Sequence, residues 1–284
     1  MILLSGTPVA GKFEKLWTHC KLLGWDISKG LYDETYVNWK KININGFPIK
    51  VVDKYNPYKN IKQLKENLHN HGAIFLKTNE VMTLPEQVFY TLNSAPPKEY
   101  KKFLLEKFVR ISDTDLIGDT TLTQLLYLRL LASAYNKNKL AQFKSLLEST
   151  DDRLVVFYNF NHELSQLKRI CEESNKPISQ ICGKTKDLNN YEQYDDTITL
   201  IQYQSGSMGF NLQKSNKIIY FSPPLSCEYW MQSMKRIHRI GQKETCFYYK
   251  MIAKDSVEEK IYAALDMGQE YTNELFRKDL ERWQ

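Results

Sequence analysis

The second half of this 284-residue sequence predicts an α/β fold in which helices flank a parallel β-sheet. From residue 137 onward, short apolar runs typical of strands alternate with segments of helical periodicity. The composition supports a packed fold, since 42% of the residues are hydrophobic and 13% are aromatic. Strands and helices that alternate along a chain are typical of parallel sheets covered by helices.

The elements of this half follow one another closely. We expect strands at residues 154–158, 178–182, 198–203, 218–221 and 246–252. Helices are expected at residues 140–147, 164–171 and 229–237, with a long helix from Val257 onward. Because ligands of such sheets bind at the carboxyl ends of the strands, we expect the glycines after Tyr203 and the charges around Arg236 in or near such loops.

The first half begins with a buried strand. The apolar run at residues 1–4 predicts this strand, and a turn at residues 5–8 and a helical pattern ended by Gly24 follow it. A single strand leaves backbone groups without partners unless other strands pair with it. We therefore expect further sheet upstream of this sequence.

Residues 26–85 are polar, aromatic and rich in Asn, which is typical of an insertion. One helix is expected there, at residues 59–70. Residues 98–110 and 121–134 show helical apolar spacing and are joined by an acidic loop that contains Gly118. This pattern predicts a small helical subdomain.

Composition excludes several function classes. No stretch approaches the roughly 18–20 uncharged apolar residues that cross a bilayer, and the start lacks the features of a secretory signal. We therefore expect a cytoplasmic protein that has no membrane partner. The five cysteines form no CxxC pair and the five histidines no HExxH pattern, so we expect neither a disulfide framework nor a bound metal.

Positive charge is concentrated in one segment. The net charge of +6 is small, so only its distribution is informative. Residues 204–254 contain two glutamates and eight basic residues, which are Lys214, Lys217, Lys235, Arg236, Arg239, Lys243, Lys250 and Lys254.

Residues Gly6 to Lys12 have the spacing of a phosphate-binding P-loop between a strand and a helix. The following position is Phe13, where a P-loop needs Ser or Thr to hold magnesium, and Pro8 removes one backbone donor. We therefore expect no phosphate binding here. A small P-loop kinase that uses Lys12 is the least favoured hypothesis.

Two later motifs could contact phosphates. Gly206 and Gly209 lie in a turn after the strand at 198–203, where glycine lets the backbone approach a phosphate, although an ordinary turn has the same pattern. In residues 232–242, Gln232, Arg236 and Arg239 are expected on one helical face. The arginine guanidinium donates two hydrogen bonds toward phosphate oxygens, so this face could clamp a triphosphate. Periodicity alone favours a solvated basic face.

Residues 5–8, the strand at 154–158, the Gly206 turn and residues 232–242 together resemble motifs III, IV, V and VI of helicase superfamily two. Residues 238–242, His-Arg-Ile-Gly-Gln, are similar to motif VI of the Swi/Snf family of double-stranded DNA translocases. Residues 221–224, Phe-Ser-Pro-Pro, resemble the short bacterial and phage members. The resemblance is strong at 150–265 and 3–17 and poor at 26–75.

The resemblance implies two RecA-like lobes with ATP between them, the first of which carries the Walker A and B motifs. This chain would then be the C-terminal half of a DNA-dependent ATPase that translocates on double-stranded DNA and remodels protein–DNA complexes. Residues 1–25 would end lobe one, 26–97 would hold a family-variable insertion and crossover, 98–136 a helical protrusion, and 137–284 the helicase C-terminal lobe. The chain alone is expected to be inactive.

The resemblance also implies roles for individual residues. Arg239 would be the arginine finger and Arg236 its companion on the γ-phosphate, with Gln232 orienting them. Gly206 and Gly209 would form the motif V turn between nucleotide and DNA. The DNA backbone would be contacted by Ser205, Thr185 and Lys184, and lobe coupling would involve Ser5, Gly6 and Thr7. ATP and Mg²⁺ would both require the missing first lobe.

Two positions depart from the family pattern. The small-residue pair of motif V is Gly206-Ser207 here, and Lys77 stands where an arginine pair often precedes Leu84-Pro85. The second departure weakens the expectation of DNA or nucleotide contacts near that segment.

A hypothesis of a different class is a non-catalytic DNA-binding or adaptor module that keeps the helicase-lobe fold. The reading frame upstream of Met1 separates the two. Walker motifs encoded there indicate a motor, whereas a stop codon and a ribosome site favour the adaptor.

Overall fold

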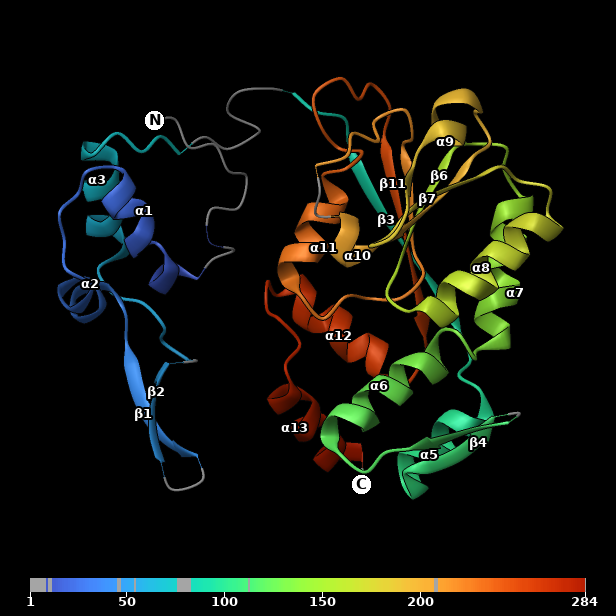
Figure 1. Cartoon of the computed structure of the whole chain (residues 1–284), viewed down its shortest axis with the longest axis horizontal. Helices are drawn as coiled ribbons and strands as arrows, with labels where there is room; N and C mark the ends of the chain where they lie inside the picture. The colour runs from blue at the N-terminus through green and yellow to red at the C-terminus, as the bar shows by residue number, and fades with distance from the viewer. Residues whose placement is uncertain are drawn as a thin grey trace. The chain divides into compact units, whose positions relative to one another are not determined.

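The computed structural model describes residues 9, 12–44, 47–53, 55–75, 83–111, 113–206 and 209–283 (Figure 1). The chain divides into two compact units, Met1–Thr83 and Leu84–Gln284. This boundary falls inside the region expected to hold the insertion and crossover, and the four-part organisation stays a prediction. The expected strand at 1–4 lies outside the described residues, as do Ser5, Gly6 and Thr7.

The first unit is a small helical cluster that carries one β-ribbon. Its helices are η1 (Phe13–Lys15), α1 (Trp17–Leu22), α2 (Lys29–Tyr36) and α3 (Ile61–Asn70). Strands β1 (Trp39–Ile44) and β2 (Phe47–Val52) pair antiparallel. The core includes Cys20, Tyr32, Leu64 and Leu68. The helix expected at 59–70 is confirmed, whereas α2 and the ribbon were not predicted.

The second unit contains a seven-stranded sheet of order β3-β11-β10-β6-β9-β7-β8. The strands are β3 (Gln87–Ser94), β6 (Leu154–Tyr158), β7 (Ile178–Ile181), β8 (Lys186–Asp187), β9 (Ile198–Gln202), β10 (Lys217–Tyr220) and β11 (Cys246–Ala253). All neighbouring strands are parallel except β7 and β8. The expected parallel sheet is confirmed, including its five expected strands, and β3 and β8 are additions.

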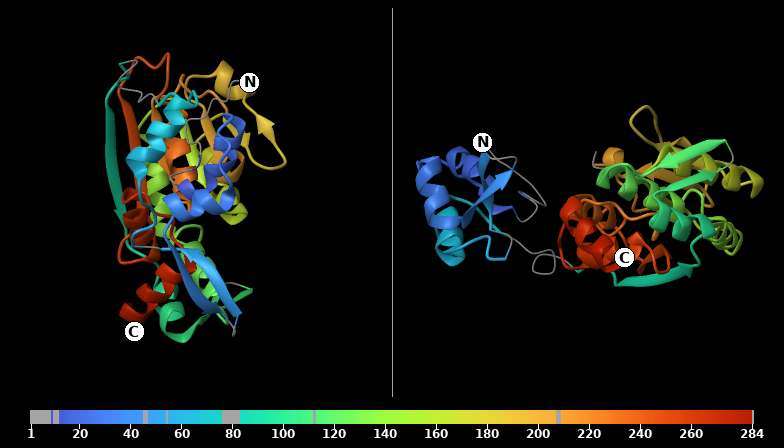
Figure 2. Two further views of the ribbon diagram at one scale, coloured as in Figure 1. Left: turned by 90° about the vertical axis from the view of Figure 1, so that its left-hand side faces the viewer. Right: turned by 90° about the horizontal axis from the view of Figure 1, so that it is seen from below.

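Helices cover both faces of this sheet (Figures 1 and 2). On one face, α7 (Lys137–Glu148) and α8 (Asn161–Glu173) pack against Val156 of β6. On the other, α6 (Thr121–Ala132), α11 (Cys227–Met234) and α12 (Val257–Asp266) pack against Phe157. Successive residues of a strand point to opposite faces, so every residue of β6 is buried and its sequence is apolar throughout.

The segment at 98–136 is only partly helical. Helix α5 (Lys98–Glu106) is followed by a hairpin of β4 (Phe108–Ile111) and β5 (Thr114–Ile117), which precedes α6. The helix expected to reach residue 110 ends at Glu106, because Lys107 adopts a left-handed φ of 57° and Phe108 begins β4. The expected helix at 121–134 is confirmed as α6, whose Thr120 cap forms a capping box.

Two short helices and a helix break complete the description of the unit. Helices α9 (Asn189–Gln193) and α10 (Tyr203–Gly206) follow β8 and β9. The single long helix expected from Val257 is wrong, since α12 ends at Asp266 and α13 (Asn273–Trp283) begins separately. Gly268 causes the break, because its φ of +72° is left-handed and cannot continue a helix.

A buried ion pair joins the starts of α7 and α12. Lys139 Nζ lies 2.7 Å from both carboxylate oxygens of Glu258, and both side chains are fully enclosed. Ala253 N donates a further hydrogen bond to Glu258, at 2.8 Å. Burial raises the pKa of Glu258 to about 7 and lowers the pKa of Lys139. Each charge therefore remains buried at low cost only while the other is present to compensate it.

Candidate functional site

The two candidate catalytic arginines lie in a turn. Helix α11 begins after its cap Ser226 and ends at Met234, and residues 235–242, here called the arginine segment, continue as turns and bends. The prediction of a helix at 229–237, with Gln232, Arg236 and Arg239 on one helical face, is therefore wrong for both arginines. Only Gln232 belongs to α11.

Side-chain donors form hydrogen bonds with backbone carbonyl groups at and just after the end of this helix. The Tyr248 hydroxyl donates to Met234 O at 3.0 Å, whereas His238 N lies 3.4 Å from the same oxygen. Gln242 Nε2 reaches Ile237 O at 3.4 Å. Met234 O therefore accepts from both a side-chain hydroxyl and a backbone N–H, and these contacts hold the turn that follows α11.

The arginine segment lies toward the amino end of the sheet. It precedes β11, in which Phe247 pairs with Lys217, the first residue of β10. Arg236 O accepts a hydrogen bond from Leu212 N at 3.1 Å, and residues 212–215 lead into β10. The expectation that the charges around Arg236 lie at the carboxyl end is therefore wrong, because the chain runs back along α11 first.

The charge of the two arginines is not balanced by carboxylates. Neither Arg236 nor Arg239 forms an ion pair among the residues that the structure describes. Burial lowers the pKa of Arg236, and the nearby positive charge of Arg239 lowers it further. Arg236 Nε and Gln232 Oε1 are buried without hydrogen-bond partners within the described chain. An unpaired buried donor is costly, so the guanidinium of Arg236 fits an anionic ligand that offers acceptor oxygens, whereas Gln232 Oε1 needs a donor.

Gln242 fastens the arginine segment to the neighbouring loop. Its Nε2 donates to Gln213 O at 3.2 Å and to Ser215 O at 3.0 Å. Its Oε1 accepts from the backbone N–H groups of Lys243 and Glu244. The sequence motif includes Gln242, but nothing in the motif predicted this bracing role.

Replacing Gly241 with alanine should destabilise the second unit by about 1–2 kcal/mol. Gly241 has a φ of +96°, and an added Cβ would lie 2.9–3.1 Å from the Gln213 side chain. Gly183→Ala is the control, because Gly183 has no atom within 4 Å of an added Cβ. Equal unfolding temperatures for the two variants would contradict this account of the turn.

Two further hydrogen bonds tie the arginine segment to the entry of the second unit. His238 Nε2 lies 2.8 Å from Pro85 O. Gln87 Nε2 donates to the Tyr248 hydroxyl at 2.8 Å, and this hydroxyl donates to Met234 O. The His238–Pro85 hydrogen bond joins residues that are 153 positions apart in sequence, and the Gln87–Tyr248 hydrogen bond joins residues that are 161 positions apart. Sequence spacing therefore gave no signal for either of them.

The candidate DNA-binding residues lie at the opposite end of the sheet. Lys184 and Thr185 are exposed in the loop between β7 and β8. Ser205, in α10 after β9, is only 5% exposed. Gly206 ends α10, and Gly209 adopts a φ of +51° that favours glycine. Residues 203–216 thus connect the carboxyl end of β9 with the amino end of β10, beside the arginine segment.

A cavity of about 170 Å³ lies at the carboxyl ends of β6 and β9. Its lining includes Asn159, Gln202 and Arg129, whose Nη2 donates to Pro223 O at 3.0 Å. Burial lowers the pKa of Arg129, and its guanidinium lies 4.8 Å from the Phe160 ring centre. Sequence analysis missed Arg129, although a single arginine in the leucine-rich run at 121–132 was a usable signal.

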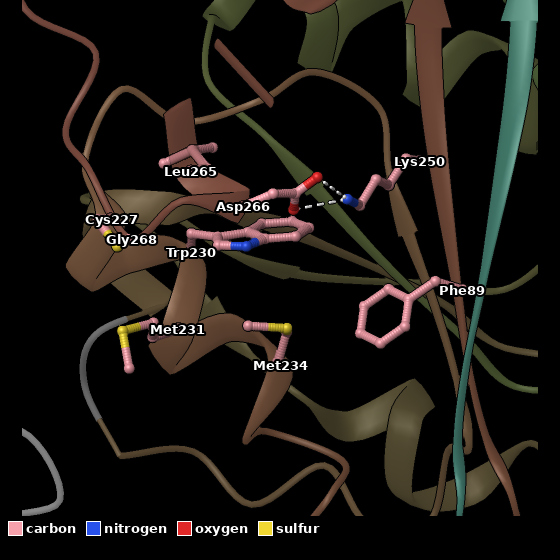
Figure 3. A pocket seen from close by; sticks show the side chains of 9 residues that line it. All are labelled: Phe89, Cys227, Trp230, Met231, Met234, Lys250, Leu265, Asp266 and Gly268. Carbon is pink, nitrogen blue, oxygen red and sulfur yellow. Dashed lines mark hydrogen bonds and ion pairs between the residues drawn. The ribbon is translucent and has the colours of Figure 1, made fainter. Parts of the chain in front are cut away.

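A larger cavity of about 370 Å³ lies beside α11 (Figure 3). Trp230, Met231, Met234 and Phe89 line it. Its charged groups are already paired, since Lys250 Nζ lies 2.8 and 2.9 Å from the carboxylate oxygens of Asp266. This cavity therefore adds no available charged group to the arginine site.

Two absences in the described ranges concern metal ions and membranes. These residues contain no group of three or more His, Cys, Asp or Glu side chains that could hold a metal ion. Within the same ranges, no helix combines the length and the apolar character needed to span a bilayer.

Known proteins resemble this chain in the region of the site. Residues 138–241 match the helicase conserved C-terminal domain family. DNA repair protein rhp54 of Schizosaccharomyces pombe is 29% identical over 124 residues, which cover 40% of this chain and 14% of that protein. The ISWI chromatin-remodeling complex ATPase ISW1 of Saccharomyces cerevisiae is 22% identical over 298 residues, or 92% of this chain and 26% of that protein.

A solved structure of the C-terminal part of the Fun30 ATPase domain matches with a TM-score of 0.45 and 20% identity. The match covers 51% of this chain and 53% of that structure. In the comparison with rhp54, this chain spans only 14% of the relative's length.

Proposed function

Because this chain carries the C-terminal lobe of a Swi/Snf-family ATPase of helicase superfamily two, we propose that it is the second lobe of a motor that translocates on double-stranded DNA and remodels protein–DNA complexes. The observation that carries the proposal is the pair of arginines without carboxylate partners, of which Arg236 has a buried Nε that lacks an acceptor. A nucleotide triphosphate supplies the missing oxygens.

The chain's own residues bind the phosphates and complement their charge. Arg239 reaches the γ-phosphate when the two lobes close, and Arg236 binds beside it. Gln232 is held by a 3.0 Å hydrogen bond from its Nε2 to Glu228, and its buried Oε1 has no partner within the described chain, so we assign it the role of orienting the arginines. ATP supplies the phosphoryl group, and Mg²⁺ is held by the first lobe.

The carboxyl end of the sheet, opposite the arginine segment, binds DNA. Lys184 and Thr185 contact phosphates of one strand, and such contacts fix position without reading sequence. Ser205 adds its hydroxyl when α10 opens, since it is buried in the present arrangement. Binding through phosphates makes the grip sequence-independent and sensitive to salt.

Residues 203–216 couple the two ends. They begin at the DNA-contacting end, contain Gly206 and Gly209, and finish where Leu212 N binds Arg236 O. A shift of this connection on DNA binding therefore moves the arginine segment. Repeated closure on ATP and opening after hydrolysis make the lobes grip DNA in turn, which produces directed movement.

The purified chain should bind duplex DNA without sequence preference but should not hydrolyse ATP. Turnover requires the first lobe, which holds Mg²⁺ and the phosphates, so DNA should stimulate hydrolysis only in the complete ATPase, defined here as this chain joined to that lobe. DNA-stimulated turnover by the chain alone, surviving further purification, would contradict the proposal. A complete protein that binds DNA without turnover would instead support an adaptor.

A further inference from the structure

The ribbon of β1 and β2 is uncovered on both faces. Its strands pair from Trp39 with Val52 to Ile44 with Phe47. Residues 40–43 and 47–50 are all exposed, and within the first unit the ribbon extends away from the helices (Figure 1). Only its base, at Trp39 and Val52, packs against the core of the unit.

The ribbon concentrates uncompensated positive charge. Residues 39–55 contain four lysines and one aspartate. Lys40 pairs with Asp53 at 2.9 Å, but Lys41 and Lys50 form no ion pair with any described acidic residue.

These two lysines lie directly opposite each other across the ribbon. Like charges in this position are destabilising. Lys50 Nζ instead lies 4.9 Å from the Trp39 ring centre, a contact that leaves its charge uncompensated. The charges of both lysines therefore remain available to an anionic ligand.

The apolar side chains of the ribbon also lack cover. Ile42 and Ile49 are opposite each other on the other face, and Phe47 is 74% exposed. A two-stranded ribbon is marginally stable in water by itself. Both its charge and its exposed apolar surface indicate a partner, and the like-charge pair selects a polyanion.

We propose that this ribbon binds duplex DNA, with Lys41 and Lys50 on backbone phosphates and Phe47 against the groove wall. The major groove of B-form DNA admits a two-stranded β-ribbon. This inference rests on the proposed function only in that the substrate is DNA. It adds a contact in the first unit that is independent of Lys184 and Thr185.

The test is the salt dependence of duplex binding by the whole chain, measured for Lys41→Ala/Lys50→Ala. A matched control, Lys62→Ala/Lys65→Ala, removes two exposed lysines from α3 in the same unit. Removing one lysine–phosphate interaction lowers the slope of log affinity against log salt by about 1, so the slope should fall by about 2 in the ribbon variant and stay unchanged in the control. Affinity near 0.1 M salt should fall by roughly tenfold or more in the ribbon variant only.

Folding does not confound this comparison. Removing the opposed lysines relieves repulsion but also removes the contact of Lys50 with Trp39, two small effects of opposite sign, so the unfolding temperature of the ribbon variant should change little. Equal slopes of log affinity against log salt for the ribbon variant and the unmodified chain would overturn the proposal. A Phe47→Ala variant that loses binding to a protein partner but keeps full DNA affinity would also overturn it. If the unmodified chain binds no DNA, the proposed function itself fails, which is a distinguishable result.

Discussion

In the complete ATPase, Arg239→Ala should lower DNA-stimulated ATP hydrolysis by a factor of about 10³ to 10⁵. The guanidinium stabilises charge that develops during phosphoryl transfer, and no other described residue except Arg236 offers a comparable group in the arginine segment. The fold, the DNA affinity and most of the ATP affinity should be retained, because the interaction is strongest in the transition state. Steady-state turnover and DNA titrations measure this directly.

Two variants control this experiment. Arg239→Lys should restore little activity, because an ammonium group lacks the planar pair of donors. Lys235→Ala removes an exposed positive charge from the same segment and should leave turnover nearly unchanged. If Arg239→Ala keeps more than about a tenth of the turnover, the loss is under roughly 1.4 kcal/mol and the finger assignment fails.

Lys139→Ala should destabilise the second unit by about 3–5 kcal/mol, the largest stability effect that we expect. The variant leaves the Glu258 carboxylate enclosed without its cation, and both groups are fully buried in the intact pair. Urea denaturation followed by circular dichroism measures the change in the free energy of unfolding.

An exposed pair between α7, the helix of Lys139, and α8 provides the control. Lys144 lies 3.1 Å from Glu173, and both side chains are at least 40% exposed, so Lys144→Ala should cost under about 1 kcal/mol. The double variant Lys139→Met/Glu258→Leu should recover much of the lost stability, because apolar side chains replace a buried pair at little cost. Similar losses for Lys139→Ala and Lys144→Ala would contradict the structural account.

The central strands could be predicted because they are buried on both faces. Strand β6 is apolar at every position, and its bounds agree with the expected 154–158. Strand β3 was missed although its Val-Phe-Tyr-Thr-Leu run has high β-propensity, because this mostly exposed edge strand lacks the continuous apolar run of a central strand. Local pattern therefore succeeded where burial is complete and failed at the edge.

The arginine site could be predicted in its residues but not in its geometry. Arg236, Arg239 and Gln232 were identified from a motif, which specifies residue types. Their turn depends on Tyr248, which follows in the next strand, and on Gln242, whose contacts with the neighbouring loop have no periodicity. The helical prediction failed because these tertiary contacts override local propensity.

The ribbon was missed for a related reason. In sequence, Gly46-Phe47-Pro48 is typical of a turn, although Phe47 and Pro48 belong to β2, and the lysines of both strands make the alternation of Ile42, Ile49 and Val51 less evident. Pairing across a turn places Lys41 opposite Lys50, a relation that only the register specifies.

The most direct test of the central claim, that this lobe supplies arginines to ATP held by another lobe, uses a transition-state analogue. The affinity of the DNA-bound complete ATPase for ADP with aluminium fluoride should be measured for the unmodified protein and for Arg239→Ala. We predict that the variant loses affinity for the analogue by a factor close to its loss of turnover, while its affinity for ADP alone changes little. Unchanged affinity for the analogue would contradict the claim and would leave Arg239 as a solvated surface charge.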